Sequence, residues 1–269
     1  MRRLLRVPVD SWVDARNVAE HLERFLWRGQ CNEQWPLETS IERAATRFGM
    51  DRELIASQEK FILKRFIRRA CYISEANPHD SDLFEWLALL QHHGGSTRLL
   101  DFTLSFPVAS FFAMETADSA CAVWGVDVAP LHSAFMEKYE KEIGSVFAGH
   151  ELNDAIAAFV GSILQSQSEY PMPPGMDEDL DSVVVATPIR ISERLAAQHG
   201  IFLVPLKLGR PFEASLKSSL RCPAEARWED CTAADVRGVD PHDIAIIKFV
   251  IPRESCSAGL ALLAEANVS

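Results

Sequence analysis

Apolar residues recur at helical spacing in several segments of the chain. In the longest, 51–73, they return every three or four positions. Shorter segments with the same spacing, or with helix start and stop signals, are 14–22, 82–90, 133–143, 151–165, 192–198 and 255–266. A further helix should begin at Ser105, because a serine followed by Pro107 is a typical helix start.

Other segments are rich in the branched and aromatic residues that favour strands. They are 24–28, 120–128, 183–187, 200–206 and 245–251. No internal repeat of fixed period interrupts this series. The pattern predicts an α+β fold: a single mixed domain over 1–269, with small central β-sheets and helical insertions. Its core would comprise 24–128 and 183–251, and a helical insertion with a Pro-rich acidic loop would occupy about 131–181.

Polar residues gather between two apolar runs at 91–103, which reads Gln-His-His-Gly-Gly-Ser-Thr-Arg-Leu-Leu-Asp-Phe-Thr. Asp82 and Glu85 are placed as a cap pair for the preceding helix, which should stop at Gly94. A second capping pair, Thr39 and Glu42, should open the helix that carries Arg43. Because a scaffold holds ligand-binding groups at such element ends, 91–103 predicts a functional site.

Composition narrows the class of protein. The chain has 269 residues, 48% of them hydrophobic, and a formal charge of −11, which opposes general attraction to nucleic acid or to an anionic membrane. No apolar run reaches the length of a membrane span or a signal peptide, and the six cysteines include no Cys-x-x-Cys pair. These features predict a cytoplasmic protein with reduced thiols, no membrane and no metal site, and make nucleic acid an improbable partner.

Several polar side chains suggest chemistry, each with a structural alternative. Arg28 and Arg98 suit phosphate or carboxylate; the alternative is that Arg98 pairs with Asp101 or Asp82 as a structural tie and that Arg28 braces a loop. His92 is either a proton-transferring group or a core or capping histidine. Asp101, between two apolar residues, needs a cationic or N–H partner.

Four motifs make the chain resemble the FRG domain family. They are Trp27-Arg28-Gly29-Gln30, Trp35-x-Leu37-x-x-Ser40-x-x-Arg43, the stretch Gln91 to Thr103, and Arg194-Leu195-x-x-Gln198-x-Gly200-x-Phe202, with the small-aromatic run Ala109 to Ala113 in the expected place. More remotely, the aromatic-Arg-Gly strand resembles the first strand of the ADP-ribosyltransferase superfamily, in which an arginine helps to hold NAD.

These resemblances imply a set of site residues and an activity. Arg28 would bind NAD together with Gln30, Gln91, Thr97, Arg98 and Arg194, and the catalytic groups would be His92, Asp101 and Gln198. A carboxylate near the ribose would stabilise an oxocarbenium-like state. Asp101 is the first candidate and Glu193 a weaker one, since no Glu-x-Glu element lies on a predicted strand.

Three functional hypotheses follow. The first is an ADP-ribosyltransferase or NAD glycohydrolase, of the kind that acts as a bacterial toxin or phage-defence effector, with NAD as substrate and with a protein acceptor or an immunity partner. The second is a non-catalytic sensor module that binds a nucleotide or a protein. The third is a nucleic-acid-processing protein that uses the basic residues between Lys60 and Arg69, although charge patterning favours a solvated helix face for those charges.

Overall fold

A computed structural model describes residues 2–70, 77–79, 82–146, 152–168, 182–188, 200–266 and 268. Within these residues the strands form one mixed sheet. Its order is β5 (Val183–Ala186), β6 (Gly200–Pro205), β3 (Leu100–Thr103), β2 (Phe25–Gln30), β4 (Cys121–Asp127), β8 (Ile244–Ile251), β1 (Arg3–Pro8) and β7 (Trp228–Asp230). Strand β1 pairs in parallel with β7 and β8, and the other neighbours are antiparallel.

The α+β prediction is confirmed, but the strands make a single eight-stranded sheet in the described residues rather than several small sheets. The sequence pattern did not predict strands β1, β3 and β7. Strands β3 and β7 have only four and three residues, too few for an alternation to stand out. Strand β1 carries Arg3 and Arg6 beside its apolar residues, and its pairing with β8 decides its conformation.

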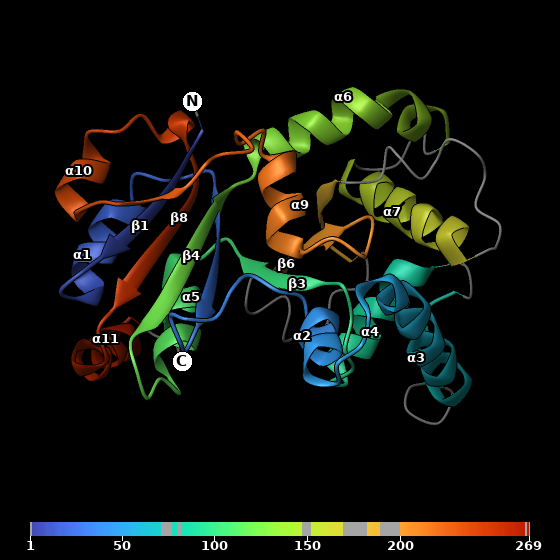
Figure 1. Ribbon diagram of the computed structural model, residues 1–269, viewed down its shortest axis with the longest axis horizontal. Helices are drawn as coiled ribbons and strands as arrows, with labels where there is room; N and C mark the ends of the chain where they lie inside the picture. The colour runs from blue at the N-terminus through green and yellow to red at the C-terminus, as the bar shows by residue number, and fades with distance from the viewer. Residues whose placement is uncertain are drawn as a thin grey trace.

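Three helices cover one face of the β1–β8–β4–β2 half of the sheet (Figure 1). They are α1 (Trp12–Ala19), α5 (Phe106–Met114) and α11 (Arg253–Glu265). Inward-facing residues of the strands, such as Trp27 and Phe249, form a buried apolar cluster with these helices. The opposite face packs against α9 (Phe212–Ser219) through Phe212 and Leu216, and α10 (Ala233–Arg237) lies beside α1.

A second group of helices surrounds the β3–β6–β5 half of the sheet (Figure 1). It comprises α2 (Ser40–Arg47), α3 (Ile55–Ala70), α4 (Leu83–His92), α6 (Ala129–Val146) and α7 (Leu152–Ser168). Apolar residues of α3, α4 and α7 pack together with Phe202 and Val204 of β6. One-turn 3₁₀ helices at Arg52–Leu54 and Pro241–Asp243 precede α3 and β8. The expected helix 51–73 therefore begins as a 3₁₀ turn.

Helix ends test the capping predictions directly. Thr39 and Glu42 form the expected capping box of α2, and the Ser105 hydroxyl accepts from the backbone N–H of Val108 at the start of α5. Asp82 does occupy the N-cap position of α4, but its side chain makes no capping hydrogen bond, so the predicted Asp82–Glu85 cap pair is wrong. The backbone of Asp82 is outside the extended region that N-caps usually adopt, which explains the difference.

Two positions near the site require glycine for different physical reasons. A Cβ on Gly29 would lie 2.0 Å from the backbone oxygen of Ala109, so α5 packs directly on the backbone of β2. Gly94 has a φ of 79°, in the left-handed region that ends the helix α4 as expected. The predicted helix 192–198 and the part of the Pro-rich acidic loop beyond Ser168 lie outside the described residues.

Candidate functional site

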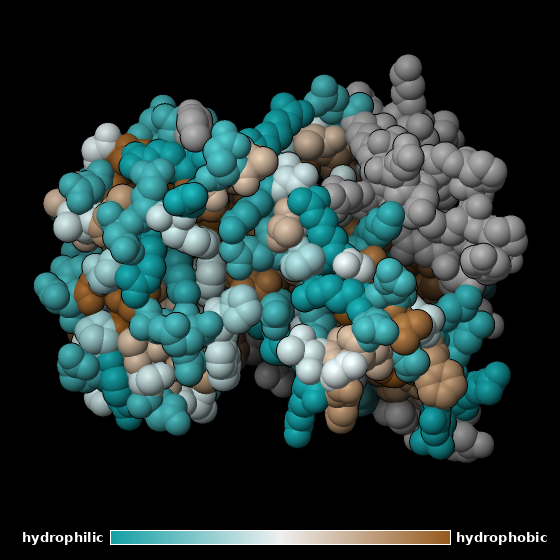
Figure 2. All heavy atoms as spheres, viewed as in Figure 1, coloured by the Kyte–Doolittle hydropathy of each residue, from teal (hydrophilic) through white to brown (hydrophobic). Residues whose placement is uncertain are grey.

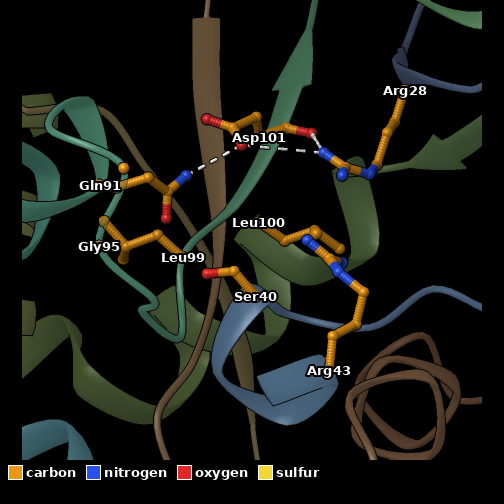
Figure 3. A pocket seen from close by; sticks show the side chains of 9 residues that line it. Arg28, Ser40, Arg43, Gln91, Gly95, Leu99, Leu100 and Asp101 are labelled. Carbon is orange, nitrogen blue, oxygen red and sulfur yellow. Dashed lines mark hydrogen bonds and ion pairs between the residues drawn. The ribbon is translucent and has the colours of Figure 1, made fainter. Parts of the chain in front are cut away.

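A pocket of about 210 Å³ opens where strands β2 and β3 separate (Figure 3). The register between these strands consists of a single pair, Trp27↔Thr103, so their remaining residues diverge. Helix α2 and the turn after α4 close the pocket around this divergence. The lining residues are Arg28, Ser40, Arg43, Gln91, Gly94, Gly95, Leu99, Leu100 and Asp101.

Arg28 reaches across the divergence from β2 to β3. Its Nη1 donates to the backbone oxygen of Asp101 at 2.8 Å and lies 3.8 Å from Oδ2 of the same residue (Figure 3). The side chain is 16% exposed, and its buried Nε has no hydrogen-bond partner in the described part of the chain. Burial lowers the pKa of Arg28, the negative charge of Asp101 opposes this, and the positive charge of Arg43 adds to it.

A chain of hydrogen bonds fixes the orientation of Asp101. The Thr97 hydroxyl donates to Oε1 of Gln91, and Nε2 of Gln91 donates to Oδ2 of Asp101 at 2.9 Å. Because an ionised carboxylate only accepts hydrogen bonds, the Gln91 amide turns its NH₂ group to Asp101 and its oxygen to the buried Thr97 hydroxyl. The Asp101 side chain itself remains 57% exposed. The pocket therefore has an accessible carboxylate that is held in a set direction.

At the floor of the pocket, helix α2 is hydrogen-bonded to the 91–103 stretch. The Ser40 hydroxyl accepts from the backbone N–H of Thr97 at 2.8 Å and donates to its backbone oxygen at 3.0 Å. A Cβ on Gly95 would lie 2.2 Å from a side-chain carbon of Leu90, so only glycine fits there without displacing that side chain. The position of α2 is thus tied to Thr97, in the segment that follows the helix α4 with Gln91 in its last turn.

Arg43 is the second cation of the pocket, and sequence reasoning left it out of the predicted site. It lies on the exposed surface of α2, where Nη1 donates to the backbone oxygen of Glu38 at 2.6 Å. In Figure 3 its guanidinium points from α2 toward Leu100 and the side of the pocket where Arg28 lies. Ser40 and Arg43 both belong to the motif that begins at Trp35, and that motif was the signal that could have identified them.

Arg98, which was predicted to bind a ligand, does not line this pocket. Its side chain is 5% exposed and pairs with Glu59 of α3, with Nε and Nη2 each 2.7 Å from Oε2. Its Nη1 donates to the backbone oxygen of Leu206. The structural tie considered for Arg98 therefore exists, but its partner is Glu59 rather than Asp101 or Asp82. Sequence alone could not choose Glu59, because it lies 39 positions away.

Two other predicted site residues also lie away from the pocket. Gln30 is 6% exposed, donates to the backbone oxygen of Pro36 and accepts from the Trp124 indole, so it braces the loop after β2. His92 is exposed at the end of α4, where its ring contacts His93, and neither histidine lines the pocket. Arg194, Gln198 and the weaker candidate Glu193 lie outside the described residues. The structure thus brings together Arg28, Gln91 and Asp101, with Thr97 behind them.

The described residues contain no group of three or more His, Cys, Asp or Glu side chains arranged to hold a metal ion. Among the same residues, no helix has both the length and the apolar character that crossing a membrane requires.

Comparison with known proteins supports one family resemblance. Residues 23–121 match the family model of the FRG domain, a segment that includes all the polar side chains of the pocket given above, namely Arg28, Ser40, Arg43, Gln91 and Asp101. No curated protein and no solved structure matches the chain. The more remote resemblance to ADP-ribosyltransferases therefore stays a prediction.

Proposed function

We propose that the pocket binds a phosphate-bearing part of NAD and that the protein cleaves the bond between nicotinamide and ribose. The ADP-ribose would pass to an acceptor, as in an ADP-ribosyltransferase, or to water, as in an NAD glycohydrolase. The observation that carries the proposal is the presence of two guanidinium groups, Arg28 and Arg43, in one pocket with the oriented carboxylate of Asp101.

The charges of the pocket favour an anionic ligand. Two arginines face one carboxylate, so the lining carries a net positive charge inside a protein whose formal charge is −11. Burial already disfavours the charged form of Arg28, and the neighbouring charge of Arg43 adds repulsion. A phosphate group would reduce that repulsion and offer an acceptor to the unpartnered Nε of Arg28.

The size of the pocket limits which part of NAD it holds. Pockets that enclose a drug-sized ligand measure about 300 to 1,000 Å³, and this one measures about 210 Å³. It suits a phosphate with part of an adjoining ribose, and the remaining groups of the dinucleotide would lie outside it.

Asp101 has the role of stabilising positive charge on the ribose. When the glycosidic bond breaks, its electron pair leaves with the nicotinamide nitrogen, and the ribose becomes an oxocarbenium-like cation. A fixed carboxylate nearby stabilises that cation more than it stabilises the bound substrate. The acceptor or water then forms the new bond to the ribose carbon and releases its proton to solvent. Gln91 and Thr97 serve this step by holding the Asp101 carboxylate in place.

A sensor module is the second candidate, and one observation favours it. Among the described residues that line the pocket, Asp101 is the only carboxylate, and it already accepts from Gln91 and lies near Arg28. A pocket of this composition binds a nucleotide without necessarily cleaving it.

One experiment separates the two candidates. Purified protein is incubated with NAD while nicotinamide release and thermal stability are followed, in the wild type and in Arg28→Ala, Arg43→Ala and Asp101→Asn. Binding to the folded state raises its stability according to the ratio of NAD concentration to the dissociation constant. For the enzyme, Asp101→Asn should still be stabilised by NAD while its release rate falls about 100-fold or more.

The other outcomes are equally informative. Both arginine variants should lose the stabilisation by NAD, whereas Arg253→Gln, an exposed site on α11, should retain it. Stabilisation without nicotinamide release assigns the sensor role. If NAD neither stabilises the protein nor is cleaved, the proposal is wrong. A toxin or defence effector of this kind would, in addition, deplete cellular NAD when expressed in bacteria, and Asp101→Asn would not.

A further inference from the structure

The outer side of helix α3 has a pattern that the proposed function does not use. Its buried side consists of Ile55, Glu59, Leu63 and Ala70, which face the core. Leu54, just before the helix, and Phe61 lie seven positions apart on the other side and are 50% and 55% exposed. Residues seven apart share one face of a helix, so these two large apolar side chains belong to a single exposed stripe.

Cations follow the apolar residues along the helix. Residues 60–69 include five basic side chains and no acidic one. The exposed ones are Lys64, Arg65, Arg68 and Arg69. We call the stripe formed by Leu54, Phe61, Lys64, Arg65 and Arg68 the outer face of α3. Figure 2 shows tan and brown side chains among teal ones at the lower right, where Figure 1 places α2 and α3.

Some arginines near the surface pair with an acidic side chain, whereas the cations of this face do not within the described residues. Arg3, Arg6 and Arg221, for example, each pair with a glutamate. Within the described residues, Lys64, Arg65 and Arg68 form no ion pair, and Arg65 instead lies over the Phe61 ring, 5.5 Å from its centroid. In a protein with 38 acidic and 27 basic residues, this stripe is a local concentration of positive charge.

We infer that the outer face of α3 is a docking surface for an acidic segment of another protein, one that carries Asp or Glu side chains beside at least one large apolar side chain. Phe61 and Leu54 supply the apolar centre of the contact, and the cations supply a charged rim. A short acidic segment matches both parts of the stripe. A long polyanion such as nucleic acid would also extend over the rest of a surface whose net charge is negative, which opposes its binding.

Selection from a displayed library of random peptides of about 16 residues tests this chemistry, with the length chosen to span the contact area of one short helix. The expected result is enrichment of peptides that are net negative and contain Phe, Leu, Ile or Trp. Their affinity, measured by fluorescence anisotropy, should fall about tenfold or more in Arg65→Glu and in Phe61→Ser, and should weaken as salt rises.

Two controls make the assignment specific. Arg253→Glu makes the same charge change at an exposed position in the first turn of α11, where an acid is favourable, and it should bind the peptides like the wild type. Arg28→Ala should also bind them normally, because the pocket cation is not part of this face. Equal affinity in Arg65→Glu and wild type would overturn the inference. So would enrichment of peptides without acidic residues, or tighter binding of a single-stranded oligonucleotide that Arg65→Glu abolishes.

Discussion

Glu59→Gln tests the buried ion pair that Arg98 forms with Glu59. The carboxylate of Glu59 accepts from the backbone N–H of Arg98 at 2.7 Å and from its guanidinium at the same distance. The two side chains are 4% and 5% exposed. This pair joins α3 to the segment that leads into β3, and so holds the strand that carries Asp101.

The expected cost follows from leaving one charge buried without its partner. Removing one member of a buried ion pair lowers the free energy of unfolding by about 3 to 5 kcal/mol. Glutamine keeps one acceptor oxygen but turns its NH₂ group toward a donor, so a loss of about 3 kcal/mol is expected. Urea unfolding followed by tryptophan fluorescence measures it. Glu53→Gln, at an exposed neighbouring position, should change the free energy of unfolding by less than about 0.5 kcal/mol.

A loss below about 1 kcal/mol in Glu59→Gln would refute the reasoning, because that is the size of an exposed pair. The double variant Glu59→Leu/Arg98→Met removes both charges and should recover part of the stability. It should also keep any stabilisation by NAD, since Arg98 is not in the pocket. Loss of NAD binding in a folded double variant would indicate that Arg98 contributes to ligand binding after all.

Three further predictions concern backbone packing, the relay to Asp101 and the thiols. Gly29→Ala places a methyl group against the Ala109 backbone oxygen and should lower the free energy of unfolding by about 2 to 3 kcal/mol in the same urea assay. Gly238→Ala is the control: the atom nearest to its added methyl group is 3.4 Å away, so the free energy of unfolding should change by less than about 1 kcal/mol. Thr97→Val removes the hydroxyl that orients Gln91. If Asp101 is catalytic, nicotinamide release should fall about tenfold. An unchanged rate in a folded variant would contradict the proposed role of the Thr97–Gln91–Asp101 hydrogen bonds. Burial raises the pKa of the Cys121, Cys222 and Cys231 thiols above 9.0, so these thiols hold their protons in the folded state where the unfolded state loses them. The free energy of unfolding should therefore decline as the pH rises above about 9, and less steeply in Cys121→Ala; an identical slope in that variant would exclude Cys121 as a cause.

Local sequence determined much of the secondary structure and several of the helix ends near the pocket. The capping box at Thr39, the start of α5 at Ser105 and the stop at Gly94 are set by neighbouring residues, and each was predicted from the sequence. Gln91, Asp101 and the two glycines of the stretch 91–103 line one pocket, and its role as a functional site stays a prediction. Such features depend on contacts within a few positions, which a single sequence displays directly.

Tertiary structure decided which polar residues share the pocket. Whether an arginine binds a ligand or an internal acid depends on what the fold places beside it: Glu59 meets Arg98 from 39 positions away, while Arg28 meets the backbone of Asp101 from 73 positions away. The short strand β3 exists because β6 pairs with it in register, and the pocket exists because β2 pairs with it at one residue only. Side-chain type and periodicity specify each element, but the partner of a buried charge and the place where two strands diverge are set by long-range packing, and one sequence carries no direct sign of either.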